Sequence, residues 1–189
     1  ANRELFFEHI KKLNLRNSIF VDNTANENIA NEYGRYLAHN IGVVTCNKIA
    51  CASTLNNYTD LKKTSRRFGT PFLFETNVGA GLPVIDTLNN LIASGDEIIK
   101  IQAILSGSLN FVFNKFTPET SFKDIVKSAQ TEGYTEPDPK IDLSGVDVAR
   151  KILILARESG FEIELSDVEN KAFLPEEVLN TDSNDAFYQ

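Results

Sequence analysis

Short apolar runs alternate with helical patterns in the first part of the chain, and this alternation limits the folds available to it. The runs are SIFVD at 18–22, IGVVTC at 41–46 and TPFLFETNV at 70–78. Each has the length of a buried strand and is bounded by polar residues. The stretches between them, at about 24–38 and 53–66, have helical spacing. Strands that alternate with helices favour right-handed crossovers, so an α/β fold with a mainly parallel sheet is predicted.

The remaining segments are predicted to add further helices and strands. An apolar stripe at 3–14 indicates a helix before the first strand. Thr24 and Glu27 fit a capping box at the start of the helix that follows that strand. Segments 98–105 and 161–169 have strand-like patterns, the second of them ending in a turn. Further helices are expected at about 84–93, 111–116, 121–133 and 147–159.

Composition and charge narrow the class of partner. With 42% hydrophobic residues among 189, the chain can bury a substantial core. The net charge of −7 argues against a nucleic acid or an anionic membrane, because both need a basic face. No apolar run approaches the roughly 18 residues that span a bilayer, and the N-terminus lacks the order of a signal peptide. We therefore expect a small-molecule partner, with no nucleic acid and no membrane.

The cysteines and histidines give no sign of a disulfide framework or a transition-metal site. Cys46 and Cys51 are the only cysteines, and they lie close together in the sequence. Two free thiols fit a reducing compartment, so we expect a cytoplasmic protein. His9 and His39 are the only histidines, and neither has a partner at metal-ligand spacing.

Polar residues follow several of the predicted strands at one edge of the sheet. They are found at 22–24 (DNT), 47–48 (NK), 75–77 (ETN) and 106–108 (SGS). Ligands of open parallel sheets collect outside the carboxyl ends of the strands. Any one of these segments could be an ordinary loop, with Lys48 a solvated charge. Four of them on one edge predict a cleft.

The turn Gly79-Ala80-Gly81 follows a predicted strand and opens a helix, as a dinucleotide fingerprint does. However, Val84 stands where G-x-G-x-x-G needs its third glycine. The turn could instead line a small cavity with main-chain oxygens, which Glu75 could join to hold a hard cation. It could also serve only to bring a helix close to a strand.

The stretch 131–160 joins an acidic loop to a well-formed helix. The loop carries Glu132, Glu136, Asp138 and Asp142. Asp147 and Lys151 stand four residues apart and so share one helix face. A lysine held beside carboxylates can bind a charged substrate and move a proton. The pair could equally be a surface ion pair of the kind common on helices.

Four motifs together resemble homoserine dehydrogenase. They are VVTCNK at 43–48, ETNVGAGLPVI at 75–85, ILSGSLNFVFN at 104–114 and GYTEPDPKIDLSGVDVARK at 133–151. The resemblance extends over about residues 19–179, and the wording of the motifs is nearest to the dehydrogenase part of bifunctional aspartokinase–homoserine dehydrogenases. It implies an enzyme of threonine and methionine biosynthesis that interconverts L-aspartate 4-semialdehyde and L-homoserine with NADP or NAD. It also implies a homodimer or higher homo-oligomer, a possible fusion to an aspartokinase, and a bound monovalent cation, usually sodium.

The same resemblance implies a role for individual residues. Lys151 is the implied proton donor to the aldehyde oxygen, and Asp147 is catalytic with it. Glu136, Asp142 and Asp147 are the implied substrate-binding residues. Thr24, Lys48 and Gly133 are the implied cofactor-binding residues. The implied cation ligands are Glu75 and the main-chain oxygens of Val78, Ala80 and Leu82.

The chain departs from the family pattern at both ends. No Gly-rich turn of the kind that grips the cofactor pyrophosphate precedes residue 22, and the family's closing Gly-rich segment is absent. We therefore expect a chain truncated at both ends that is inactive by itself. The expected divisions are 1–70, the C-terminal half of a Rossmann-like nucleotide-binding domain; 71–179, an α+β catalytic and dimerisation domain with a mixed sheet; and 180–189, a flexible tail. Lys140-Ile141 replaces the more usual Arg-Asp pair in the acidic loop, which we expect to be tolerated.

Three functional hypotheses remain open from the sequence. The first is the catalytic core of homoserine dehydrogenase. The second is a non-catalytic module of that enzyme for dimerisation and substrate binding. The third is a related oxidoreductase that acts on another amino-acid semialdehyde. Turnover with homoserine, and its loss on substitution of Lys151, would distinguish them.

Overall fold

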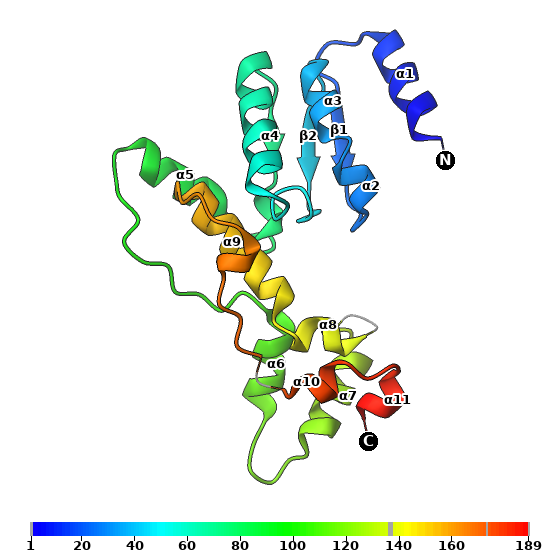
Figure 1. The fold of residues 1–189 in the computed structure, drawn as a ribbon, viewed down its shortest axis with the longest axis vertical. Helices are drawn as coiled ribbons and strands as arrows, with labels where there is room; N and C mark the ends of the chain where they lie inside the picture. The colour runs from blue at the N-terminus through cyan, green and yellow to red at the C-terminus, as the bar shows by residue number, and fades with distance from the viewer. Residues whose placement is uncertain (1, 136–137, 173, 189) are drawn as a thin grey trace. The chain divides into compact units, whose positions relative to one another are not determined.

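The computed structural model describes residues 2–135, 138–172 and 174–188, and it divides into two compact units (Figure 1). Unit 1 comprises residues 1–97 and 153–165, and unit 2 comprises 98–152 and 166–189. The boundary at 152/153 falls within one helix, α9 (Val146–Glu158). This division reflects compactness, so the functional domains expected at 1–70 and 71–179 stay a prediction. Each unit is described separately below.

Unit 1 is built on a three-stranded parallel sheet, which confirms the predicted α/β arrangement. The strands are β1 (Ile19–Asp22), β2 (Gly42–Thr45) and β3 (Phe72–Leu73), in that order across the sheet. Asp22 lies beside Thr45 in the register of β1 and β2. The carboxyl ends of these two strands are therefore adjacent.

The third strand is shorter than predicted. β3 ends at Leu73, and a 3-10 helix, η1 (Glu75–Asn77), replaces the rest of the run expected at 70–78. The backbone amide of Asn77 donates to the Phe74 carbonyl oxygen at 3.0 Å, and the Val78 amide donates to that of Glu75 at 3.3 Å. These local bonds turn the chain away from the sheet, so the apolar run continues without being a strand.

Helices α3 and α4 pack against one face of the sheet. Their core includes Tyr33, Leu37 and Val43, all fully buried. The helices of unit 1, apart from α9, are α1 (Arg3–Leu13), α2 (Glu27–Ala30), α3 (Tyr33–Ala38), α4 (Leu55–Phe68) and α5 (Val84–Ala93).

The helix predicted at 24–38 is in fact two short helices, and its cap was assigned to the wrong residue. Asn26, not Thr24, is the N-cap of α2, and its Oδ1 accepts from the Ile29 amide at 3.3 Å. Thr24 Oγ1 instead accepts from the Asn26 amide at 3.1 Å, which makes a turn before the helix. Asn and Thr are both good caps, and the local geometry decides between them.

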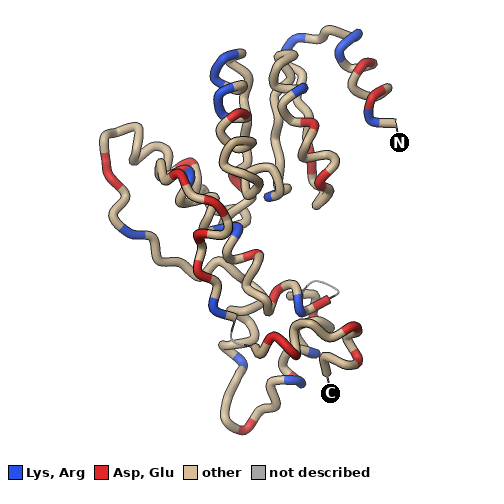
Figure 2. The backbone as a smooth tube through the Cα atoms, in the orientation of Figure 1, with Lys and Arg blue, Asp and Glu red and all other residues tan. Residues whose placement is uncertain are grey.

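Helix α4 lies close to the helix predicted at about 53–66, but it begins at Leu55 and ends at Phe68, two residues later at each end. Thr54 Oγ1 accepts from the Asn57 amide at 3.3 Å at the start, and Gly69 adopts a left-handed φ of 61° after the last turn. Arg66 and Arg67 lie in that last turn, and Figure 2 shows the backbone at this end of α4 in the blue of basic residues. Cations there oppose the partial negative charge of the helix C-terminus.

Unit 2 is helical in its described part. Its helices, besides the first half of α9, are α6 (Gly107–Lys115), α7 (Phe122–Thr131), α8 (Pro139–Leu143), α10 (Glu176–Leu179) and α11 (Asn184–Phe187). The core of the unit consists of Val112, Ile125, Val126, Ala129 and Leu143. The segment 180–189 was expected to be a flexible tail. It contains the short helix α11, and Phe187 and Tyr188 pack against this core.

The strands predicted at 98–105 and 161–169 are wrong. The described residues of 98–189 contain no strand, so the expected mixed sheet is not formed there. A strand needs backbone hydrogen bonds to a neighbouring strand, and an alternating apolar pattern does not supply one. Ile99 and Ile104 are 97% and 81% exposed in the irregular segment before α6. Part of the second segment, Leu165–Asp167, is a 3-10 helix, η2.

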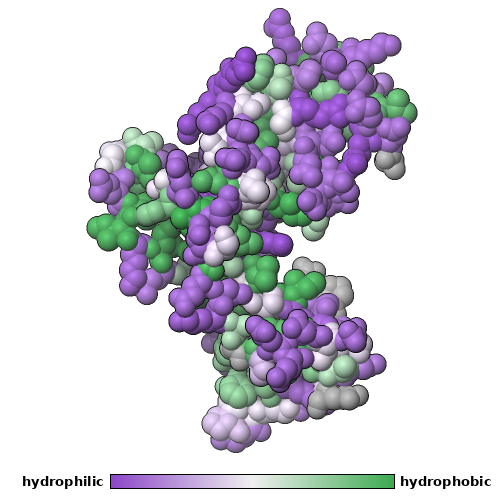
Figure 3. Space-filling model, in the orientation of Figure 1, coloured by the Kyte–Doolittle hydropathy of each residue, from purple (hydrophilic) through white to green (hydrophobic). Residues whose placement is uncertain are grey.

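Apolar side chains also reach the surface of unit 1. Leu82 and Leu91 are exposed, and Figure 3 shows hydrophobic side chains at the surface around α5. Among the residues that the structure describes, no helix is long and apolar enough to cross a membrane.

Candidate functional site

The predicted catalytic pair of unit 2 is assembled in the first half of α9. Lys151 Nζ lies 2.7 Å from Asp147 Oδ2 and donates to the main-chain oxygen of Leu105 at 2.6 Å. The Lys151 side chain is 16% exposed, and that of Asp147 is 34% exposed. We call Lys151, Asp147 and the Leu105 carbonyl the lysine cluster. An ammonium group has three N–H donors, so it can hold these two acceptors and donate one more bond to a substrate oxygen.

The Leu105 carbonyl is a partner that sequence reasoning missed. It stands in the irregular segment just before α6. A main-chain oxygen has no residue-type signature, so no motif could have identified it. Its effect is to hold the Lys151 side chain against a second part of the unit as well as against its own helix.

A chain of short polar contacts continues from the start of α6 to α8. Ser106 Oγ is the N-cap acceptor for the Leu109 amide at 3.1 Å and lies 2.9 Å from Ser108 Oγ. Ser108 Oγ in turn donates to Asp142 Oδ1 at 2.8 Å. The structure therefore joins the predicted substrate residue Asp142 to the SGS segment, which was predicted to follow a strand but in fact begins α6.

Glu136 and Gly133 are the other two site residues predicted in this part of the chain. Glu136 lies outside the described residues. Gly133 follows α7 with a left-handed φ of 77°, and the Tyr134 amide donates to the Ala129 carbonyl oxygen at 2.8 Å across this turn. A glycine here is explained by the conformation that ends the helix.

In unit 1, a buried polar network lies at the carboxyl ends of β1 and β2. Asp22 is 2% exposed, and its Oδ2 accepts from the Tyr33 hydroxyl at 2.5 Å and from Asn47 Nδ2 at 3.1 Å. The Tyr33 oxygen also lies 2.7 Å from Thr45 Oγ1. We call Asp22, Tyr33, Thr45 and Asn47 the strand-end network.

The network affects the protonation of its members. Burial alone would raise the pKa of Asp22, but the hydrogen bonds from Tyr33, Thr24 and Asn47 outweigh it and lower that pKa. Burial raises the pKa of the Tyr33 hydroxyl, and its bond to Asp22 raises it further. At neutral pH the pair is thus a carboxylate and a neutral phenol that donates to it.

The predicted cofactor residues of unit 1 flank this network. Thr24 is exposed, and its amide donates to Asp22 Oδ1 at 2.8 Å. Lys48 is half-buried and directly follows Asn47 in the loop after β2. Tyr33 was not among the residues predicted for the site. One general rule could have pointed to its hydroxyl group, because a buried tyrosine needs a polar partner for that group.

The Gly79 turn has a structural role in unit 1. Gly79 has a φ of 83°, and a Cβ there would lie 2.6 Å from Val84 Cγ2. The turn therefore needs glycine for close packing, as one of the sequence hypotheses held. Glu75 Oε1 and Oε2 accept from the amides of Ile85 and Asp86, each at 2.8 Å. The carboxylate thus caps the N-terminus of α5.

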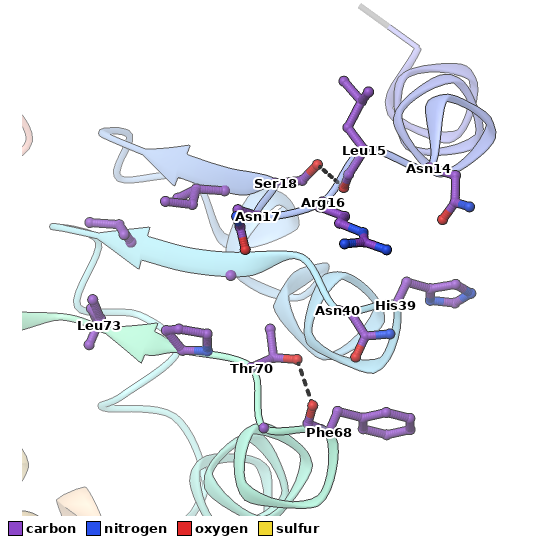
Figure 4. Close-up of a pocket in the computed structure, with 15 residues that line it drawn as sticks. Asn14, Leu15, Arg16, Asn17, Ser18, His39, Asn40, Phe68, Thr70 and Leu73 are labelled. Atoms are coloured by element: carbon purple, nitrogen blue, oxygen red, sulfur yellow. Dashed lines mark hydrogen bonds between the residues drawn. The ribbon is translucent and has the colours of Figure 1, made fainter.

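A cavity of about 690 Å³ in unit 1 lies away from these groups (Figure 4). It is bounded by the amino ends of the strands, with Ser18, Asn40 and Thr70 on its wall, and by the uncovered face of the sheet, with Val44 and Leu73. Its lining, all of it described, includes none of the predicted site residues. The opposite ends of the strands carry the strand-end network.

Comparison with protein families matches both parts of the chain. The family described as "Homoserine dehydrogenase, NAD binding domain" matches residues 1–75, and the family described as "Homoserine dehydrogenase" matches residues 83–186.

Curated relatives carry the same name. A bifunctional aspartokinase/homoserine dehydrogenase of Haemophilus influenzae is 47% identical over 184 residues, which cover 97% of this chain and 23% of the relative. A homoserine dehydrogenase of Schizosaccharomyces pombe is 47% identical over 165 residues, covering 84% of this chain and 44% of the relative. The chain thus spans less than half the length of either relative.

Solved structures are similar in fold. A protein of unknown function from Candida auris is 36% identical with a TM-score of 0.91, over 100% of this chain and 54% of that one. A hyperthermophilic archaeal homoserine dehydrogenase in complex with NADPH is 28% identical with a TM-score of 0.69, over 80% of this chain and 49% of that one.

Proposed function

This chain belongs to the homoserine dehydrogenase family, and from that premise we propose that the protein interconverts L-aspartate 4-semialdehyde and L-homoserine with a nicotinamide cofactor. The observation that carries the proposal is the lysine cluster, in which a largely buried ammonium is held by Asp147 and by the Leu105 carbonyl. Such a fixed ammonium is suited to a reaction that builds negative charge on a carbonyl oxygen.

Lys151 acts as the proton donor in the direction of aldehyde reduction. The cofactor, when bound, supplies the hydride to the carbonyl carbon. The developing oxyanion accepts a hydrogen bond from Lys151 Nζ and then its proton, which yields the homoserine hydroxyl. Asp147 and the Leu105 carbonyl keep Nζ in place during this transfer. In the oxidation of homoserine, Lys151 takes the proton back.

Asp147 and Glu136 are proposed to hold the α-ammonium group that both substrates carry, and Asp142 is proposed to shape the same pocket. All three roles come from the family resemblance. The position of Asp142 supports its role, because Ser108 Oγ, at the start of α6, donates to its carboxylate at 2.8 Å.

Thr24, Lys48 and Gly133 are the proposed cofactor-binding residues. Support comes from the position of Thr24 and Lys48 after β1 and β2, because ligands of open parallel sheets bind outside the carboxyl ends of the strands. The match of residues 1–75 to an NAD-binding domain supports the same assignment. The choice between NADP and NAD rests on a residue near the adenosine ribose, which these positions do not identify.

A monovalent cation, with sodium the expected ion, is proposed at Glu75 and the main-chain oxygens of Val78, Ala80 and Leu82. One carboxylate and three carbonyl oxygens form a donor set that suits a hard cation. Two of these proposed ligands also have structural roles. The Leu82 carbonyl oxygen accepts a hydrogen bond from the Val84 amide at 2.9 Å, and the Glu75 carboxylate caps α5.

The assembly and location of the protein are also proposals. The name of the Haemophilus influenzae relative supports a fusion to an aspartokinase. A homodimer or higher homo-oligomer and a cytoplasmic location stay predictions from the sequence. A non-catalytic fragment and an oxidoreductase for another amino-acid semialdehyde are the alternatives to the main proposal.

The test is the turnover of Lys151→Ala in the product of the complete coding sequence. General acid–base groups contribute roughly 10²–10⁴-fold, so we expect kcat for homoserine oxidation to fall by at least about 100-fold. Homoserine binding, measured by calorimetry, should change little. The matched control is Lys171→Ala, which removes a lysine that is 82% exposed in the same unit. Wild-type turnover in Lys151→Ala would contradict the assignment, and an unmodified protein that oxidises only another hydroxy amino acid would favour the second alternative.

A further inference from the structure

Asp22 is a buried charge that the proposed reaction does not use. It is the last residue of β1, and both of its oxygens are occupied by donors. Oδ1 accepts from the Thr24 amide, and Oδ2 accepts from the Tyr33 hydroxyl and from Asn47 Nδ2. A buried carboxylate is retained at little penalty only when its oxygens are bonded in this way.

The three donors come from three different elements. Thr24 belongs to the loop after β1, Tyr33 belongs to α3, and Asn47 belongs to the loop after β2. Asn47 adds two more links, since its Nδ2 donates to the Asn26 carbonyl oxygen at 3.1 Å and its backbone amide donates to Thr45 Oγ1 at 2.9 Å. The loops after the two strands are therefore tied to each other through the Asp22 carboxylate and the Asn47 amide.

These two loops carry the proposed cofactor residues of unit 1. Thr24 stands two residues after Asp22 and is bonded to it directly. Lys48 stands one residue after Asn47, and Asn47 Oδ1 accepts from the Ile49 amide at 3.1 Å on the other side of Lys48. The Asn47 side chain, which the Asp22 carboxylate holds, therefore also holds the backbone on the far side of Lys48.

We infer that Asp22 is a positioning residue that sets the loops after β1 and β2 for the nicotinamide cofactor. It acts through its hydrogen bonds to Thr24 and Asn47, and Asn47 in turn sets the position of the neighbouring Lys48. The inference rests on the proposed function, because it concerns the same cofactor. It goes beyond that function by assigning a role to Asp22 and Tyr33 that neither the motifs nor the catalytic chemistry requires.

The experiment compares Asp22→Asn and Tyr33→Phe with the unmodified product of the complete coding sequence. Asn replaces one acceptor oxygen with an NH₂ group that faces donors, and Phe removes one donor while keeping the ring. Misplacement of a binding group by about 1 Å can cost up to roughly 100-fold, so for Asp22→Asn we expect the KM for the cofactor and the Kd for NADPH to rise by about 10- to 100-fold. The KM for homoserine should stay within about twofold. Tyr33→Phe should move the same two constants in the same direction, but by less.

The control variant is Asp60→Asn, which neutralises an exposed aspartate on α4 of the same unit. If Asp22 had only a structural role, Asp22→Asn would lower the melting temperature and the active fraction but would leave the KM and Kd for the cofactor unchanged in the folded protein. That result would overturn the inference. If Asp22→Asn does not fold, Tyr33→Phe decides by the same criterion. Failure of the proposed function has a different signature, namely an unmodified protein that binds NADPH but does not oxidise homoserine. An unmodified protein that does not bind NADPH would overturn both.

Discussion

Arg157 shows how a single residue in the last turn of α9 stabilises unit 1. Its side chain is fully buried, and the guanidinium donates to the main-chain oxygens of Cys51, Ser53 and Ile163 at 3.0, 2.7 and 3.1 Å. Arg157 also pairs with Glu164 at 3.0 Å. Burial lowers the pKa of Arg157, although the nearby acidic groups oppose this shift. The planar guanidinium donates to three carbonyl groups and the Glu164 carboxylate at once, and these four acceptors exceed the three N–H donors of a lysine.

We predict that Arg157→Met strongly destabilises unit 1. The substitution leaves three carbonyl groups without their donor, and a buried polar group left without its hydrogen-bond partner typically costs about 1–3 kcal/mol. The measurement is the free energy of unfolding in urea. Arg150→Met is the matched control, because Arg150 is exposed on the same helix and should change stability by about 0.5 kcal/mol or less. Equal effects of the two substitutions would show that the buried contacts contribute little.

Only some of these residue contacts could be predicted from the sequence. The spacing of Asp147 and Lys151 predicted a shared helix face, and the structure confirms their contact at 2.7 Å. Arg157 resembles an ordinary helix charge, although it stands four residues after Leu153 and thus on the apolar stripe. The Leu105 carbonyl and the Tyr33 hydroxyl became recognisable only when the fold brought distant segments together. Local spacing predicts local contacts, and the long-range partners depend on tertiary packing.

At the scale of elements, Glu75 connects the Gly79 turn to α5. Its carboxylate accepts two backbone amides at the helix N-terminus, where a negative charge is favourable. The same carboxylate is a proposed ligand of the monovalent cation. The two roles make different predictions for the same substitution.

We predict that Glu75→Gln lowers the stability of unit 1 by about 1 kcal/mol, because a neutral amide offers one acceptor oxygen instead of two. We also predict that it weakens the dependence of activity on sodium. The measurements are thermal unfolding without sodium and a sodium titration of homoserine oxidation. Glu97→Gln, at an exposed position of the same unit, is the control. A loss of stability with an unchanged sodium titration would leave only the capping role.

Helices were predicted more reliably than strands, for a physical reason. A helix satisfies its backbone within its own segment, so apolar spacing together with a capping residue such as Ser121 can identify it from sequence. A strand is completed by a neighbour, so the patterns at 98–105 and 161–169 were necessary for a sheet and yet insufficient. β1 and β2 were predicted correctly because they are successive strands in the chain that pair with each other, and α3, which lies between them in the sequence, packs against β2.

At the scale of the molecule, the 189 residues contain the proposed site residues but no Gly-rich turn of the dinucleotide-binding kind. In dinucleotide-binding folds, the pyrophosphate is gripped by a Gly-rich turn and the helix N-terminus that follows it. No G-x-G-x-x-G sequence occurs in the chain. The proposed cofactor residues Thr24, Lys48 and Gly133 do not form such a turn.

We therefore predict that the 189-residue chain by itself binds NADPH weakly, with a Kd above about 100 µM, which corresponds to less than roughly 5.5 kcal/mol of binding free energy. The pyrophosphate contributes much of the charge of the cofactor, and a chain without its grip loses that contribution. Isothermal calorimetry on the isolated chain measures this directly, with a dinucleotide-binding protein that has an intact turn as the positive control. Circular dichroism should establish beforehand that the chain is folded, so that weak binding is not an effect of unfolding. Binding in the low micromolar range would show that the groups after β1 and β2 suffice to hold the cofactor.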